Sequence, residues 1–196
     1  MRKSDIIRFF DKLSSEWDSG LEPNDAKMNV ILDTAGVKSG DCVLDIACGT
    51  GVMIDYYLAR NVSAVTGIDI SKGMAEIAEK KYAGNERVTI ICGDAESYSF
   101  SSQYDRCVIF NAFPHFCSPQ SLFENLYKVI RKGGTLTVAH DWGRKEIDRR
   151  HKDSASSVSN GLMSADELEK IFLSCGFSDI TKSDEDEIYI VSGKKE

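Results

Sequence analysis

The sequence predicts an α/β fold, a doubly wound and mostly parallel sheet of seven strands that ends in an antiparallel hairpin. Two observations predict it. Apolar runs typical of strands alternate with helix-like patterns, and this alternation is typical of parallel sheets covered by helices on both faces. Near the C-terminus, the acidic run 184–187 separates two strand-like segments by too few residues for a crossover helix, so these two strands must pair antiparallel.

Local signals place the elements in order. Strands are expected at 42–47, 64–68, 88–92, 106–110, 134–140, 177–183 and 187–192. Helices are expected between them, at 51–60, 72–82, 119–130 and 165–175. Ser71 and Ser164 are predicted N-caps, Ser164 forms a capping box with Glu167, and the glycines at 133–134 end a helix before the fifth strand. We interpret the acidic run 184–187 as a solvated turn at the far end from the chemistry, rather than a metal site.

Two regions fall outside this alternation. Segments 4–15 and 24–35 are predicted helices that precede the first strand, within an N-terminal helical cap at 1–36. Segment 141–163 is a long, polar, serine-rich connection after the fifth strand, and long connections in compact domains are usually lids or binding loops. No linker or repeat divides the chain, so we expect one domain over 1–196.

Composition excludes several classes of protein. The 196 residues are 42% hydrophobic and 28% charged, which is typical of a globular domain, and the net charge of −7 disfavours nucleic acid as a partner. No apolar run is long enough to span a membrane, and residues 1–15 lack the features of a signal peptide. The six cysteines form no C-x-x-C pair and are expected as buried free thiols, so we expect a cytoplasmic protein.

A glycine-rich turn follows the first predicted strand, in the run from Val43 to Gly51. Glycines there allow the backbone to approach a ligand closely, and the next helix offers free N–H groups at its start. A dinucleotide-binding turn of the G-x-G-x-x-G type needs a third glycine where this chain has Ile54. A phosphate-binding P-loop is also disfavoured, because no Lys-Ser/Thr pair follows the turn.

Acidic residues stand at the ends of the next two strands. Asp69, at the second, is placed to accept both hydroxyls of a ribose; the alternative is a helix-capping role, but Ser71 already caps that helix. Asp94, at the third, is placed to accept a hydrogen bond from the exocyclic amine of adenine, with the N–H of Ala95 beside it. The three strand ends together indicate a nucleoside site.

This arrangement resembles the class I S-adenosylmethionine-dependent methyltransferases. The first motif of that family is similar to the run from Val43 to Gly51, and its second and third strand ends are similar to Asp69 and to residues 93–95. The resemblance implies S-adenosylmethionine as the cofactor and a Rossmann-like methyltransferase fold. It also implies that the cofactor is bound by Asp45, Ala47, Gly49, Gly51, Asp69, Ile70, Asp94, Ala95 and Asn111, with Asn111 beside the sulfonium.

The first twenty residues resemble one branch of this family. Phe9, Phe10 and Asp11, followed by Asp18, look like the N-terminal cap of the quinone-biosynthesis-like, small-molecule branch of the family. Aromatic residues at helical spacing are also common in ordinary protein cores.

Histidines follow the fourth and fifth strands, where the family places methyl transfer. His115 and His140 are the candidate catalytic residues, because an imidazole titrates near neutral pH and suits a general base. A purely structural role is the alternative for each, and substrate binding is open for His140, Asp141 and His151. A metal site made by these histidines is disfavoured, because no short His/Cys spacing supports it.

Positive charge gathers in the predicted lid, at Arg144, Lys145, Arg149, Arg150 and Lys152. It would attract an anionic substrate, but Glu146 and Asp148 lie between these residues at helical spacing. A salt-bridged, solvated helix is therefore the favoured interpretation.

We expect an S-adenosylmethionine-dependent methyltransferase that acts on a small molecule, with the acceptor atom left open among O, N, S and C. A protein that binds the cofactor without chemistry, as a sensor or partner subunit, is the alternative. An NAD(P)-dependent oxidoreductase is disfavoured by Ile54 and by the Gly-Asp-Ala sequence at 93–95.

Overall fold

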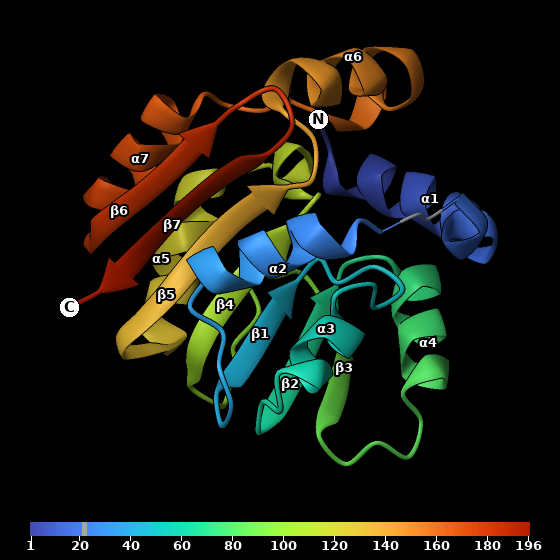
Figure 1. The fold of residues 1–196 in the computed structure, drawn as a ribbon. Helices are drawn as coiled ribbons and strands as arrows, with labels where there is room; N and C mark the ends of the chain where they lie inside the picture. The colour runs from blue at the N-terminus through green and yellow to red at the C-terminus, as the bar shows by residue number, and fades with distance from the viewer. Residues whose placement is uncertain (21–22) are drawn as a thin grey trace.

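The computed structural model describes residues 1–20 and 23–196. Its centre is a seven-stranded sheet (Figure 1), which confirms the predicted doubly wound α/β fold. From one edge to the other, the strands are β3 (Val88–Cys92), β2 (Ala64–Asp69), β1 (Cys42–Ile46), β4 (Tyr104–Phe110), β5 (Ile130–His140), β7 (Tyr189–Lys195) and β6 (Phe177–Asp184).

The first five strands of the sequence pair in parallel, and β7 pairs antiparallel with both β5 and β6. The predicted C-terminal hairpin is therefore confirmed. Its position corrects one expectation: Tyr189 lies opposite His140, so the acidic turn 185–188 lies at the carboxyl end of β5. Because the carboxyl ends of the parallel strands share this edge, the turn is next to the candidate site and not far from it.

Helices cover both faces of the sheet. On one face, α2 (Asp25–Thr34) and α3 (Ile54–Ala59) bury Ile31 and Tyr57 against Val43 and its neighbours. On the other, α5 (Pro119–Val129) and α7 (Ala165–Ser174) bury Phe123 and Phe172 against alternate residues of the same strands. Side chains of a strand alternate between faces, so the near-continuous apolar strands of this sequence supply both cores.

The N-caps are confirmed where they were expected. The Ser71 side chain accepts a hydrogen bond from the Met74 N–H at the start of α4 (Lys72–Lys81), and Ser164 with Glu167 forms the capping box of α7. Side-chain oxygens at these positions satisfy N–H groups that have no partner within the helix.

The ends of the parallel strands are covered by the N-terminal segment and by segment 141–163. The former contains α1 (Lys3–Leu13) and the 3-10 helix η1 (Ser14–Gly20); the latter, expected as a long connection, forms α6 (Arg144–Ser154) and η3 (Ser156–Val158). Figure 1 shows α1 and α6 beyond the arrowheads of the parallel strands. Ile6 of the first segment packs with Ala155 and Val158 of the second. From here on, the cap means residues 3–20 only, the first part of the N-terminal cap expected at 1–36, and the lid means residues 141–163.

Within the described part of the chain, no helix is both long and apolar enough to cross a membrane.

Candidate active site

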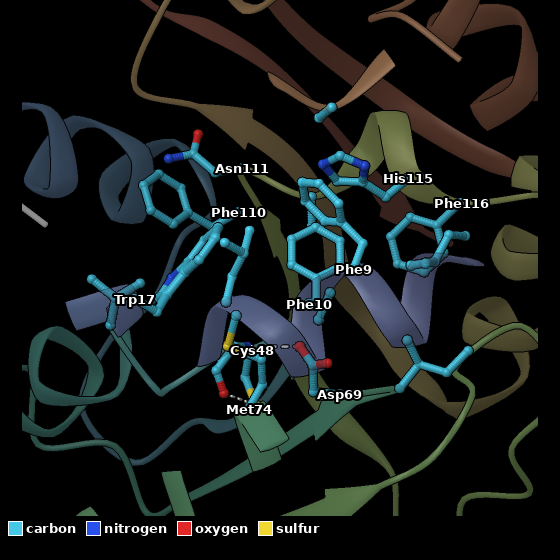
Figure 2. A pocket seen from close by; sticks show the side chains of 18 of the residues that line it. Phe9, Phe10, Trp17, Cys48, Asp69, Met74, Phe110, Asn111, His115 and Phe116 are labelled. Atoms are coloured by element: carbon cyan, nitrogen blue, oxygen red, sulfur yellow. Dashed lines mark hydrogen bonds between the residues drawn. The ribbon is translucent and has the colours of Figure 1, made fainter. Parts of the chain in front are cut away.

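A cavity of about 680 Å³ lies between the carboxyl ends of the strands, the cap and the lid. In Figure 2, Cys48 and Asp69 lie at the bottom of the view, Phe10 and His115 lie above them, and Trp17 and Phe110 lie to the left of Phe10. Ligand sites of doubly wound sheets occupy this position, and their usual volumes include this one. The cavity is lined by most of the residues that the sequence singled out.

The turn after β1 brings bare backbone to the cavity. Ala47, Gly49 and Gly51 have φ angles of 54°, 56° and 90°, a left-handed region that costs side chains energy. A Cβ atom on Gly51 would lie 2.7 Å from the ring of Tyr82, so this glycine is required by both conformation and space. Ala47 and Gly49 line the cavity.

Asp45, the one acidic residue of β1, is only 1% exposed and does not itself line the cavity, whereas Ala47, two residues further on, does. Its Oδ1 accepts a long hydrogen bond of 3.4 Å from the Tyr57 hydroxyl, while Oδ2 has no partner among the described residues. Burial, together with the nearby Asp69 carboxylate, raises the pKa of Asp45 to about 8. A buried carboxyl group with an unpartnered oxygen suits a positively charged ligand group close to it, because the nearby cation favours the ionised form of the carboxyl.

Asp69 connects the first two strand ends. Its Oδ2 accepts the N–H of Gly49 at 2.9 Å, and its Oδ1 accepts the N–H of Ser71 at 2.8 Å. Burial raises its pKa to about 6, and the two backbone N–H groups oppose that shift. The carboxylate lines the cavity and each of its oxygens has a second lone pair, so it can still accept hydroxyl groups.

At the end of β3, Asp94 and Glu96 share one cation. Lys3 of the cap contacts Oδ2 of Asp94 and Oε2 of Glu96, each at 2.5 Å. Asp94 and Ala95 line the cavity, as the adenine role implied by the resemblance requires. Ile70 also lines it and packs against the residues that join cap and lid.

Asn111, at the end of β4, adopts a φ of 52°. Its Nδ2 donates to Oδ1 of Asp141 at 2.8 Å, and its Oδ1 accepts the Asp141 N–H at 3.2 Å. The two neighbouring strand ends are therefore fastened together, and both residues line the cavity.

His115 also lines the cavity, from the 3-10 turn η2 (Phe113–His115). Its Nδ1 lies 2.6 Å from the carbonyl oxygen of Val158 in the lid. Its ring centroid is 5.0 Å from that of Phe10 and 4.9 Å from that of His151. Burial lowers the pKa of His115 to about 4, so the ring is neutral at pH 7.

His140 is placed differently from what the sequence led us to expect. It has no exposed surface, does not line the cavity, and neither ring nitrogen has a hydrogen-bond partner among the described residues. It packs edge-on to Tyr189, and burial lowers its pKa to about 3. In this conformation it cannot contact a substrate, so the geometry does not support the catalytic role expected for it. Its side chain points to the core because β5 is buried on both faces.

The lid cations are largely paired. Arg149 and Arg150 both bond to Glu146, while Arg144 pairs with Asp184 and Lys145 with Asp186. These pairs fit the salt-bridged helix favoured by the sequence, and part of the acidic run 184–187 supplies their partners.

Several lining residues were not singled out from the sequence. Trp17 of η1 and Trp142 of the lid, the two tryptophans of the chain, both line the cavity. Two cations contact the ring of Trp142, with Lys27 at 4.8 Å and Arg150 at 4.4 Å from its centroid. Trp142 stands two residues after the end of the fifth strand, and that position was the available signal in the sequence. No sequence signal indicated Lys3 as a lining residue.

No group of three or more His, Cys, Asp or Glu side chains in the described residues has a geometry suited to a metal ion. All six cysteines are free; Cys48 and Cys107 are buried, whereas Cys92 is exposed, so the expectation of buried thiols holds only in part.

Sequence similarity relates the chain to known methyltransferases. A family model described as "Methyltransferase domain" matches residues 43–134. The malonyl-[acyl-carrier protein] O-methyltransferase of Priestia megaterium is 37% identical over 95 residues, 48% of this chain and 34% of that protein. The demethylmenaquinone methyltransferase of Clavibacter sepedonicus is 27% identical over 139 residues, 68% of this chain and 56% of that protein. The chain thus spans about a third to just over half of these relatives.

Solved structures of low sequence identity share the fold. Phosphoethanolamine N-methyltransferase 2 of Haemonchus contortus has a TM-score of 0.77 at 19% identity, covering 98% of this chain and 59% of that one. The [4+2]-cyclase SpnF has a TM-score of 0.77 at 15% identity, covering 100% and 97%. Because the second is named a cyclase, likeness of fold alone does not define the reaction.

Proposed function

We propose that this chain, which contains a domain of the class I S-adenosylmethionine-dependent methyltransferases, transfers a methyl group from S-adenosylmethionine to a small molecule bound in the same cavity. The observation that carries the proposal is Asp45. Its carboxyl group is buried, has an unpartnered oxygen and stands just before the turn whose Ala47 and Gly49 line the cavity, so it fits the charged methionine portion of a donor bound against that turn.

The chain's own residues would hold the donor in three parts. Asp45 and the turn from Ala47 to Gly51 would bind the methionine portion. The ammonium group of the donor would supply the hydrogen-bond partner that Oδ2 of Asp45 lacks. Asp69, with Ile70 beside it, would accept the ribose hydroxyls. Adenine would lie against Asp94 and Ala95.

When bound, the donor supplies a sulfonium methyl group that is already activated for transfer. The protein's contribution is then to orient the acceptor and to exclude water. Asn111, fastened to Asp141, fixes the geometry of the two strand ends that face the sulfonium in this proposal. The contact of Ile6 with Ala155 and Val158 holds the cap against the lid over these strand ends.

His115 is the one residue we propose as a proton acceptor. It lines the cavity and its orientation is fixed through Val158. The names of the relatives describe acceptors as different as malonyl-[acyl-carrier protein] and demethylmenaquinone, and the aromatic cap residues Phe9 and Phe10 suit a small acceptor of the latter kind.

Labelled methyl transfer tests this proposal. The protein is incubated with S-adenosylmethionine carrying a ¹³C methyl group and a metabolite extract, and mass spectrometry then searches for a product heavier by one labelled methyl. A labelled product that depends on the protein is expected. Tight binding of the donor with no labelled product in any extract would support the alternative, a protein that binds the cofactor without catalysis.

A further inference from the structure

One half of the cavity carries a row of aromatic rings. The ring centroid of Phe10 is 5.7 Å from that of Trp17 and 5.0 Å from that of His115, which in turn is 4.9 Å from that of His151. The row joins the cap, the end of β4 and the lid, and all four residues line the cavity. Figure 2 shows Phe10 and His115 above Asp69, on the far side from Asn111. A flat apolar molecule fits such a wall.

Every charged side chain among the described residues that line the cavity already has a partner. Of the two cations, Lys3 is held by Asp94 and Glu96, and Arg150 is held by Glu146 and stacked on Trp142. The carboxylates of Asp69 and Asp141 accept hydrogen bonds from backbone and from Asn111, respectively. An acceptor with a net charge would therefore lack a free counterion, and burying such a charge is costly.

The hydrogen bond to Val158 determines which ring nitrogen of His115 carries the hydrogen. A carbonyl oxygen only accepts, so Nδ1 must carry the hydrogen and Nε2 must carry the lone pair. Nε2 makes no hydrogen bond to any residue in 1–20 or 23–196. Nε2 of His115 is thus a hydrogen-bond acceptor whose orientation is fixed from the lid. The other imidazole of the row, His151, has its Nδ1 2.8 Å from the hydroxyl of Ser159.

We propose that the methyl acceptor is an uncharged aromatic compound with a hydroxyl group, its ring packed against Phe10 and Trp17 and its hydroxyl donating to Nε2 of His115. This rests on the proposed function. The acceptor oxygen forms a bond to the methyl carbon as the sulfur–methyl bond breaks, leaving its electron pair on sulfur. The hydroxyl proton moves to Nε2, so the positive charge of the sulfonium ends on the imidazole, which then releases the proton to water.

The test uses 2-naphthol, 2-methoxynaphthalene and 2-naphthoate as probes, each titrated calorimetrically into the protein saturated with S-adenosylhomocysteine. We expect 2-naphthol to bind about threefold to tenfold more tightly than 2-methoxynaphthalene, because only the former can donate to Nε2. 2-Naphthoate should bind least tightly. Incubation with S-adenosylmethionine should convert 2-naphthol to its methyl ether.

Variants assign the preference to particular side chains. His115→Phe should bind 2-naphthol and 2-methoxynaphthalene equally, whereas His151→Phe, the matched control, should keep the preference. Phe10→Leu should weaken both ligands and leave their ratio unchanged. Affinity for S-adenosylhomocysteine, measured for each variant, reports whether the variant is folded.

Equal affinities of 2-naphthol and 2-methoxynaphthalene for the unmodified protein, tighter binding of 2-naphthoate, or methylation of 2-naphthol at carbon would each overturn the inference. Failure of S-adenosylhomocysteine to bind the unmodified protein would instead overturn the proposed function, and the three probes would then be compared without it.

Discussion

Replacing Asp45 with Asn should make the ligand-free protein more stable at alkaline pH and less able to bind S-adenosylmethionine. Burial raises the pKa of Asp45 to about 8, whereas the pKa of an aspartate in an unfolded chain is about 3.9. Between these values the unfolded chain loses its proton before the native protein does. Stability is therefore full below the unfolded pKa and is lost as pH rises toward the folded pKa. Asn has nearly the same shape and does not titrate.

The size of this effect follows from proton linkage. As pH rises from about 5 to 8, Asp45 is ionised in the unfolded chain but still largely protonated in the native protein. This difference should lower the free energy of unfolding by roughly 3–4 kcal/mol. For a domain of this length that corresponds to a shift in melting temperature on the order of 10 °C. The absolute stability of the variant also contains the cost of its buried amide, so the pH dependence of the difference is the quantity to compare.

Differential scanning calorimetry of both proteins across this pH range provides the measurement. The stability of Asp45→Asn relative to the parent should rise steadily with pH, while Asp55→Asn, a change of an exposed carboxylate near the start of α3, should follow the parent. Affinity for S-adenosylmethionine should fall at least tenfold in Asp45→Asn, because a charge-assisted hydrogen bond is lost. A stability difference that does not vary with pH would refute the reasoning.

Four further predictions concern other parts of the site. Asp69→Ala should weaken S-adenosylhomocysteine binding at least tenfold in calorimetry with an unchanged circular dichroism spectrum; equal affinity would reduce Asp69 to a turn-stabilising residue. Gly51→Ala should be less stable to urea than Gly40→Ala by roughly 1–3 kcal/mol, since both have φ near 90° but only the former Cβ meets Tyr82; equal stabilities would show that the close approach of Tyr82 does not constrain the turn. His140→Leu should keep methyl transfer. As pH falls from about 6.5 to 4, the free energy of unfolding of the parent should drop by roughly 2–3 kcal/mol more than that of the variant, because His140, whose pKa is lowered to about 3, is neutral in the native protein and becomes protonated on unfolding. Loss of turnover at unchanged donor affinity would show instead that His140 acts on the substrate. Ile6→Asp should speed proteolysis within 141–163, because it weakens the contact between cap and lid. Bound donor and acceptor should slow proteolysis in the parent. Cleavage at the same rate in variant and parent would show that the cap does not hold the lid in place.

The strands along the chain, the C-terminal hairpin and the strand-end residues could be predicted because they depend on local signals. Period-two and continuous apolar runs, serine caps and the glycine turn each act within a few residues, so the sheet, the Ser164 capping box and the place of Asp69 at the end of the second strand were accessible.

What the sequence could not predict depends on contacts between distant segments. The pairing of β7 with β5 brings the acidic turn to the site edge, and no local pattern determines that register. Burial of His140 depends on Tyr189, which lies on a strand much further along the chain. Helix α6 was indicated only by its charge spacing, because its composition is polar and Ile147 is its one buried residue.

Calorimetric titration of S-adenosylhomocysteine into the protein tests the central claim most directly. The site predicts saturable binding to one site per chain, which weakens in Asp45→Asn and in Asp69→Ala, and no measurable heat of binding with NAD. Tighter binding of NAD, or S-adenosylhomocysteine affinity that is the same in the parent and in both variants, would contradict the assignment of this cavity.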